Sequence, residues 1–188
     1  MASSCTDFCA LVGRLGRFAR GLQYGDGLNP AQWEALRFLA RANRYSCNPS
    51  ALAEFLGSTK GTVSQTLIAL EGKGYLRRVR GFRDRRAVRL ELTAAGEALL
   101  AGDPLVRLNA AAERLEPTLR AALIEGLGQI LRNVERGEGC SEFGICVTCG
   151  AFLGDAAVGE PEGPNRCGLT GEPVSADEAG RICVSYRV

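Results

Sequence analysis

The stretch from Ser58 to Gly96 constrains the fold more than any other part of this 188-residue chain. It joins a short polar helix, a glycine-spaced turn and a hairpin rich in arginine. Between Lys73 and Glu91, eight basic residues stand against two acidic ones, a local charge of +6 in a chain whose net charge is +2. Charge concentrated on one hairpin beside a polar helix is typical of a surface that binds a double-helical polyanion.

Two short helices, joined by a tight turn, are predicted immediately before this hairpin. Asn48-Pro49 has the pattern of an N-cap followed by proline at the first helical position, and Gly57 stands where a helix-ending glycine belongs. Ser58-Thr59 then caps a second helix that runs to about Glu71. An earlier helix begins in the same way, at Asn29-Pro30. The pattern predicts a helix-turn-helix.

The second helix of this pair divides into two faces. Val63, Leu67 and Leu70 share one side and are expected to pack on the preceding helices. The opposite face has short side chains and many hydrogen-bonding groups, which suits contacts to base edges and phosphates in a major groove. An ordinary solvated face would usually carry Glu and Lys instead. The residues predicted to contact DNA here are Ser58, Thr59, Lys60, Thr62, Ser64 and Gln65.

The arginine-rich segment is predicted to form a wing. Leu76 to Arg80 and Ala87 to Leu92 have the composition of two strands, and the loop between them is too polar and too basic to be buried. The side chains expected to point inward are Val88, Leu90 and Leu92. Asp84 is expected to shape the wing tip by pairing with Arg86, rather than to contact an anion. The arginines predicted to reach the DNA backbone or minor groove are Arg80, Arg83, Arg85 and Arg86.

Amphipathic helices at both ends of this region predict a dimer. Residues 8–22 and residues 94–136 carry apolar stripes at helical spacing, with helix breaks or starts at Pro104 and Pro117. The stripes consist chiefly of Phe8, Leu11, Leu15, Phe18 and Leu22 at the start and of Leu119, Leu123, Leu127, Ile130 and Val134 at the end. A compact winged helix offers these faces no partner. Packing against a second copy would place two recognition helices on successive turns of a duplex.

Charge and cysteine content divide the chain in two. Residues 1–136 carry 20 basic and 13 acidic groups, whereas residues 137–188 carry 3 and 8. We therefore expect a winged-helix DNA-binding and dimerisation domain over 1–136 and a cysteine-rich segment over 137–188 that stays away from nucleic acid. No run approaches the 18 apolar residues of a membrane span, so we expect a protein with no membrane partner, in the cytoplasm.

The order of these elements resembles the multiple-antibiotic-resistance regulator (MarR) family over about residues 8–135. The most specific part is an aspartate-arginine pair leading into a strand and then LTxxG, here Asp84, Arg86, Leu92, Thr93 and Gly96. The resemblance implies a homodimeric winged-helix regulator, usually a repressor, that binds an inverted repeat. It also implies a small-molecule or oxidant effector near the dimerisation region. The chain departs from the family in its C-terminal extension of about fifty residues and in Pro104.

The C-terminal segment is predicted to bind a metal. Its apolar content is too thin to fold unaided, and a bound metal would supply the missing order. Four cysteines are spaced Cx2C-x17-C-x15-C, namely Cys146, Cys149, Cys167 and Cys183, with Cys140 a possible substitute. Structural zinc sites usually pair two CxxC knuckles, and this segment has one. An iron–sulfur cluster accepts scattered single cysteines and is placed slightly ahead of zinc.

The sequence therefore predicts a mostly α protein with a small β-wing, a winged helix-turn-helix that dimerises through its terminal helices and carries a metal-dependent tail. The function expected is sequence-specific transcriptional regulation, with redox or iron sensing if the tail holds a cluster. A structural zinc with a separate small-molecule effector is the alternative. A remote alternative is an iron–sulfur electron carrier or enzyme subunit. We expect no enzyme, because the sequence has no histidine, no nucleotide-binding glycine loop and no nucleophile–base pair.

Overall fold

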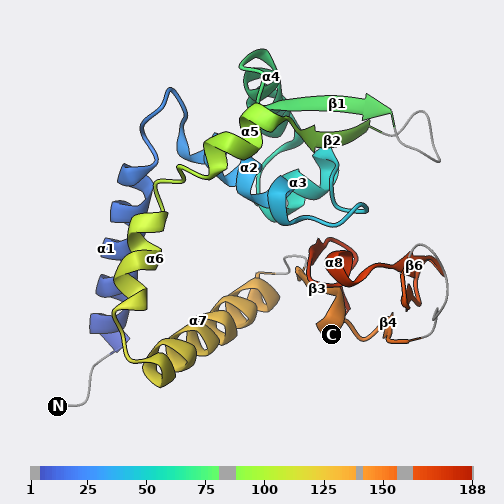
Figure 1. Cartoon of the computed structure of the whole chain (residues 1–188). Helices are drawn as coiled ribbons and strands as arrows, with labels where there is room; N and C mark the ends of the chain where they lie inside the picture. Colours follow the sequence, from blue (N-terminus) through green and yellow to red (C-terminus); the bar gives the residue numbers. More distant parts are fainter. Residues whose placement is uncertain (1–4, 81–87, 139–141, 156–162, 188) are drawn as a thin grey trace.

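The computed structural model describes residues 5–80, 88–138, 142–155 and 163–187. Figure 1 shows three parts: helices α2, α3 and α4 with the hairpin β1–β2, an extended group formed by α1, α6 and α7, and the cysteine-rich tail. The tail lies beyond α3, on the side away from α4 (Figure 1). Within the described ranges, every helix is too short or too polar to cross a membrane.

The three helices of the central part begin where the sequence predicts. α2 spans Pro30–Arg41 and α3 spans Pro49–Phe55, with Asn29 and Asn48 as their side-chain N-caps. Asn29 also forms a reciprocal capping box, since its Oδ1 accepts from the Gln32 amide while Gln32 Oε1 accepts from the Asn29 amide. α4 spans Lys60–Gly72 and is capped by Thr59. Gly57, in the turn between α3 and α4, has φ +56°, a conformation that favours glycine.

The hairpin pairs β1, Leu76–Arg80, with β2, Val88–Leu92, in antiparallel register from Leu76 opposite Leu92 to Arg80 opposite Val88. The predicted first strand is therefore confirmed, while Ala87 lies outside the described residues. Leu90 is buried in the core as expected, but Val88 is 42% exposed. The prediction that Val88 points inward is wrong, because its end of the hairpin extends past the helices into solvent (Figure 1).

A single apolar core joins the helices to the hairpin. α2, α3, α4 and both strands contribute fully buried side chains, which a domain of this size needs to offset chain entropy. The largest of them are Trp33, Leu36, Phe38, Leu52, Leu67, Leu70, Leu76 and Leu90. This core holds α4 firmly against α2 and α3, so its outer face is presented on a rigid support.

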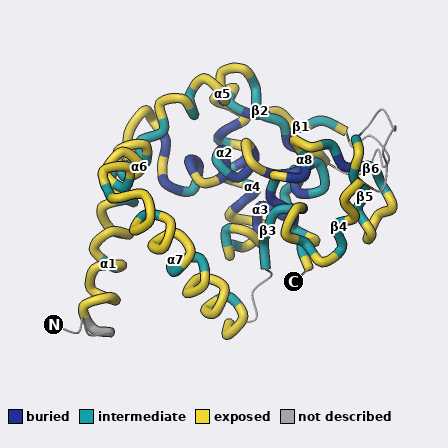
Figure 2. Tube along the Cα trace, turned by 60° about the horizontal axis from the view of Figure 1, so that its bottom comes forward, coloured by how far each residue is buried: buried dark blue, intermediate teal, exposed yellow. Residues whose placement is uncertain are grey.

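The terminal helices leave long apolar faces in solvent. α1 spans Cys5–Leu22, and after the short α5, Ala94–Leu100, come α6, Val106–Glu113, and α7, Pro117–Gly137. The breaks predicted at Pro104 and Pro117 are confirmed. In Figure 2 most residues of these helices carry the colour for exposed residues. Their exposed large apolar residues include Leu11, Leu15, Phe18, Leu119, Leu123, Leu127, Ile130 and Val134, each 42–59% exposed.

The tail has little regular structure, as expected from its composition. Its elements are β3, Gly144–Ile145; a short 3-10 turn, η1, Cys146–Thr148; β4, Phe152–Leu153; β5, Asn165–Cys167; β6, Pro173–Val174; α8, Ala176–Ala179; and β7, Ile182–Cys183. β3 pairs with β7, and β4, β5 and β6 form a second small antiparallel sheet.

The tail packs directly on the winged helix. Ile182 belongs to the same buried cluster as Trp33 and forms a parallel bridge with Ala42. Phe55, which the apolar pattern of α3 suggests is a core residue, is instead 39% exposed. Its ring lies 4.6 Å from that of Phe38 and 5.2 Å from that of Phe143, so it connects the core to the tail.

Gly96 provides a test of the packing between the wing and α5. A Cβ atom added at Gly96 would lie 2.1 Å from the carbonyl oxygen of Tyr75, an oxygen that also accepts a hydrogen bond from the Thr93 amide. Gly96→Ala must therefore shift the backbone, and we expect it to lower the free energy of unfolding by about 1–3 kcal/mol. Gly72→Ala is the matched control, because the same change on the exposed end of α4 meets nothing within 4 Å. Equal urea midpoints for the two variants would contradict this packing.

Candidate DNA-binding surface and cysteine site

The candidate recognition surface lies on α4. Val63, Leu67 and Leu70 are buried against the core, as the sequence predicts. Lys60, Thr62 and Gln65, by contrast, lie on the exposed side. The exposed N-terminal end of a thirteen-residue helix also carries unpaired backbone N–H groups and partial positive charge, which favours phosphate. The helix can therefore present both base-reading side chains and an anion-binding end.

The predicted contact residues on α4 differ in how available they are. Thr59 Oγ1 accepts from the Thr62 amide at 3.2 Å and lies 2.9 Å from Thr62 Oγ1, so Thr59 acts first as the helix cap. Ser58 and Ser64 are half-buried. The side chains that reach furthest into solvent are thus those of Lys60, Thr62 and Gln65.

Several basic residues near the hairpin are engaged by glutamates. Arg77 donates to Glu91 at 2.8 Å, and Arg78 lies 3.6 Å from Glu71. Lys73 donates to the Gly27 carbonyl oxygen and lies 3.4 Å from Gln32 Oε1, which ties the end of α4 to the start of α2. These contacts reduce the charge available for DNA below the +6 counted from the sequence.

The outer end of the hairpin carries the remaining predicted contacts. Arg80 is exposed at the last position of β1. The other wing residues predicted from the sequence lie outside the described residues: Arg83, Arg85 and Arg86, together with Asp84.

The structure brings the four predicted metal ligands of the tail to one place. Cys146, Cys149, Cys167 and Cys183 together line a cavity of about 20 Å³. The rest of its wall is mainly apolar, contributed by Ala151, Phe152, Leu169 and Val174, with Ser185. Cys140 lies outside the described residues. Among those that are described, no three cysteine or acidic side chains converge closely enough to form a metal site as they stand.

Hydrogen-bond donors surround the sulfur atoms. Asn43 Nδ2 lies 3.6 Å from Cys146 Sγ, and the Arg187 amide lies 3.4 Å from Cys149 Sγ. The Ser185 amide and the Asn43 side chain also donate to the Cys183 sulfur. Donors aimed at sulfur stabilise the thiolate more than the neutral thiol. The site is therefore arranged for negatively charged sulfur.

Cys146 and Cys183 share a proton in this arrangement. A hydrogen bond from the Cys146 thiol lowers the pKa of Cys183 to about 6, although burial acts in the opposite direction. The same hydrogen bond, reinforced by burial, raises the pKa of Cys146. The hydrogen bond therefore favours the thiolate of Cys183 over its thiol. Binding of a metal cation to these cysteines would release their remaining thiol protons.

Asn43 is a residue of this site that the sequence did not indicate. It follows α2, is 1% exposed, and its Oδ1 accepts from the Ser46 hydroxyl at 2.8 Å and from the amides of Ser46 and Tyr45. Those three donors fix which end of the amide faces the sulfurs. A lone asparagine 103 positions before Cys146 gives no local signal of such a contact.

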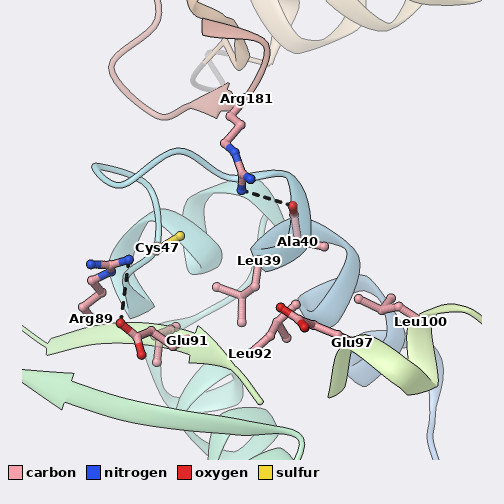
Figure 3. Close-up of a pocket in the computed structure, with 10 residues that line it drawn as sticks. Leu39, Ala40, Cys47, Arg89, Glu91, Leu92, Glu97, Leu100 and Arg181 are labelled. Carbon is pink, nitrogen blue, oxygen red and sulfur yellow. Dashed lines mark hydrogen bonds and ion pairs between the residues drawn. The ribbon is translucent and has the colours of Figure 1, made fainter. Parts of the chain in front are cut away.

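A larger cleft of about 560 Å³ lies between α2, β2, α5 and the tail. Figure 3 shows Arg89 paired with Glu91 on one side and Arg181 reaching the Ala40 carbonyl oxygen on the other. Cys47 lies in the wall, and burial raises the pKa of its thiol. Its lining mixes leucine side chains with charged groups, as ligand clefts commonly do.

Comparison with known proteins agrees with this geometry. The MarR family model matches residues 26–87. A comparison with curated proteins found no match.

Solved structures share the fold of this chain. The transcriptional regulator PA3341 is 29% identical with a TM-score of 0.58, covering 69% of this chain and 98% of its own. The transcriptional repressor CouR, bound to a 23-mer DNA duplex, is 28% identical with a TM-score of 0.55, covering 68% and 92%. A MarR transcriptional regulator from Methanosarcina mazei Go1 is 21% identical with a TM-score of 0.57, covering 69% and 96%. The chain is therefore similar to the MarR family over residues 26–87, and the solved transcriptional regulators share the winged-helix fold around this match.

Proposed function

We propose that this protein is a sequence-specific DNA-binding transcriptional repressor that binds an inverted repeat as a homodimer. The observation that carries the proposal is the exposed polar face of α4. This face is held on a rigid core beside a hairpin whose first strand ends at Arg80. The similar CouR structure is that of a repressor on a DNA duplex. Such a regulator acts on chromosomal DNA, and we assign it to the cytoplasm.

In the proposed complex, α4 lies in the major groove. Thr62 and Gln65 are placed to meet base edges, while Lys60 and the helix N-terminus meet the phosphate backbone. Gln65 is the best candidate for base reading, because its amide can pair with two hydrogen-bonding positions of one adenine. Arg80 extends the contact along the backbone as a point of positive charge.

The dimer is proposed from the exposed faces of the terminal helices. α1 and α7 both carry apolar stripes in which most residues are more than 40% exposed in a single chain. Exposed apolar patches of this extent mark interaction surfaces in soluble proteins. A two-fold arrangement would bury both stripes at once and would fix the spacing of the two α4 helices.

A small-molecule effector is proposed for the cleft beside Cys47. The cleft touches β2 of the wing and α5, which leads into the proposed dimerisation helices. A ligand there would contact both parts, and so could change their relative position if it bound one arrangement more tightly than another.

Arg80→Ala tests the wing contact. Removing one phosphate contact should weaken binding to specific and unrelated duplexes alike and should reduce the slope of log K against log salt by about 1. Fluorescence anisotropy titrations across a salt series measure both quantities. Arg187→Ala removes the same charge from an exposed position in the tail and should leave both unchanged. An unchanged slope for Arg80→Ala would remove this residue from the interface.

Gln65→Ala tests base reading. We expect the preferred site recovered by selection from a random duplex library to change at one position in each half-site, with about 1–3 kcal/mol of discrimination lost there. Gln129→Ala is the control, since it makes the same change on the surface of α7, where Gln129 contacts Glu125. Recovery of the same site with the same selectivity would show that Gln65 does not read a base.

Leu127→Glu tests the dimer. A buried charge in the proposed interface should convert the dimer to a monomer and weaken operator binding, because each half-site would then be bound separately. Sedimentation velocity and operator titration give the two readouts. Gln129→Glu introduces the same charge two residues further along α7 and should remain dimeric. A Leu127→Glu protein that sediments and binds like the wild type would contradict the proposed interface.

A further inference from the structure

We propose that Cys146, Cys149, Cys167 and Cys183 bind one zinc ion through four thiolates, and that Asn43 of the winged helix supports this site from the second coordination shell. The site would fasten the tail to the DNA-binding domain. The inference does not depend on the proposed function, because zinc binding is measurable without DNA.

The donor set and the size of the cavity favour a single ion. The four cysteines come from separate parts of the tail and line one space. Metal binding would draw their sulfurs closer together than they now lie, into the four-thiolate tetrahedron of a structural zinc site. A volume of about 20 Å³ accommodates one water-sized atom. An iron–sulfur cluster brings at least two iron and two sulfide atoms into the same space. The small size of this space is the reason that we propose zinc in place of the cluster favoured by the cysteine spacing.

The local backbone supports thiolate ligation. Cys146 begins the turn η1, and the Cys149 amide donates to the Cys146 carbonyl oxygen at 2.9 Å, which closes a turn whose two cysteines both line the cavity. The amides of Ser185 and Arg187 donate to the sulfurs of Cys183 and Cys149. Such N–H to sulfur bonds disperse the negative charge of zinc-bound thiolates. Reduced neutral thiols would not need them.

Asn43 supplies the connection to the winged helix. Its side-chain amide is buried, its oxygen is satisfied by three donors, and its nitrogen faces the sulfurs of Cys146 and Cys183. Its own backbone amide donates to the Ile182 carbonyl oxygen at 2.9 Å. The Val184 amide donates to Ser46 Oγ at 2.8 Å. The segment just before α3 therefore contacts the residues on both sides of Cys183, one of the proposed ligands.

Ion pairs hold the two sides of this junction in register. Arg44 lies 3.3 Å from Glu172 and 3.1 Å from Glu178, and the Tyr45 hydroxyl donates to Glu172 at 2.6 Å. The acidic tail thus meets basic and polar groups of the winged helix at the same loop that carries Asn43. A tail that served only as a loose extension would have no need of these contacts.

Elemental analysis of the full chain, purified under reducing conditions with zinc in the growth medium, tests the metal directly. We expect one zinc per chain and neither iron nor sulfide. Replacement of zinc by cobalt should give the intense sulfur-to-cobalt absorption of a tetrahedral four-thiolate site. Iron with sulfide, or a reduced, folded protein that takes up no metal, would overturn the proposal, and neither measurement requires a variant to fold.

Variants then test the ligands and the supporting amide. Cys146→Ser should lose zinc and the cobalt spectrum, whereas Cys47→Ser, a free cysteine outside the site, should keep both. Asn43→Asp keeps the shape but replaces the donor with an acceptor, and should lower zinc affinity at least about tenfold in competition with a chelator. Full zinc in Cys146→Ser would overturn the ligand assignment. An unchanged affinity in Asn43→Asp, with native circular dichroism, would remove Asn43 from the site.

Discussion

The contacts of Asn43 determine how the two parts of the molecule are joined. Its side-chain oxygen organises the turn before α3, its backbone pairs with β7, and its side-chain nitrogen faces the cysteine cavity. Because Asn43 is buried, its backbone amide and its side-chain nitrogen would lose their partners if the tail moved away. The position of the tail is therefore tied to the helix-turn-helix itself, and not only to the linker after α7.

A second constraint comes from the shape of the apolar surface. α2, α3, α4 and the hairpin bury their apolar side chains in one core, while α1 and α7 leave theirs exposed. These elements share one core with Ile182 of the tail, whereas the terminal helices leave apolar surface in solvent. This division explains why the proposed base-reading residues lie on the rigid part. The parts proposed to set the distance between two copies are the long terminal helices.

The sequence predicts local structure well and distant contacts poorly. Capping residues such as Asn29 and Asn48 determine helix starts through neighbouring atoms, so both starts are predicted correctly. The exposure of Val88 is missed because alternation along a strand does not reveal where the hairpin leaves the core. Asn43 and Phe55 are missed for a related reason, since their roles depend on residues of the tail about ninety or more positions later. The gathering of the four cysteines was predicted from spacing, whereas the size of the space between them required the structure.

The insertion of Ile182 into the main core has a consequence for the order of events during synthesis. Ile182 lies six residues before the end of the chain, yet it packs with side chains of α2 that are made some 140 residues earlier. Until Ile182 has emerged from the ribosome this contact is not available, and the first 137 residues keep one side of their core uncovered. Contacts so far apart in sequence also slow folding. Native packing of the winged helix is therefore completed only after Ile182 has left the ribosome.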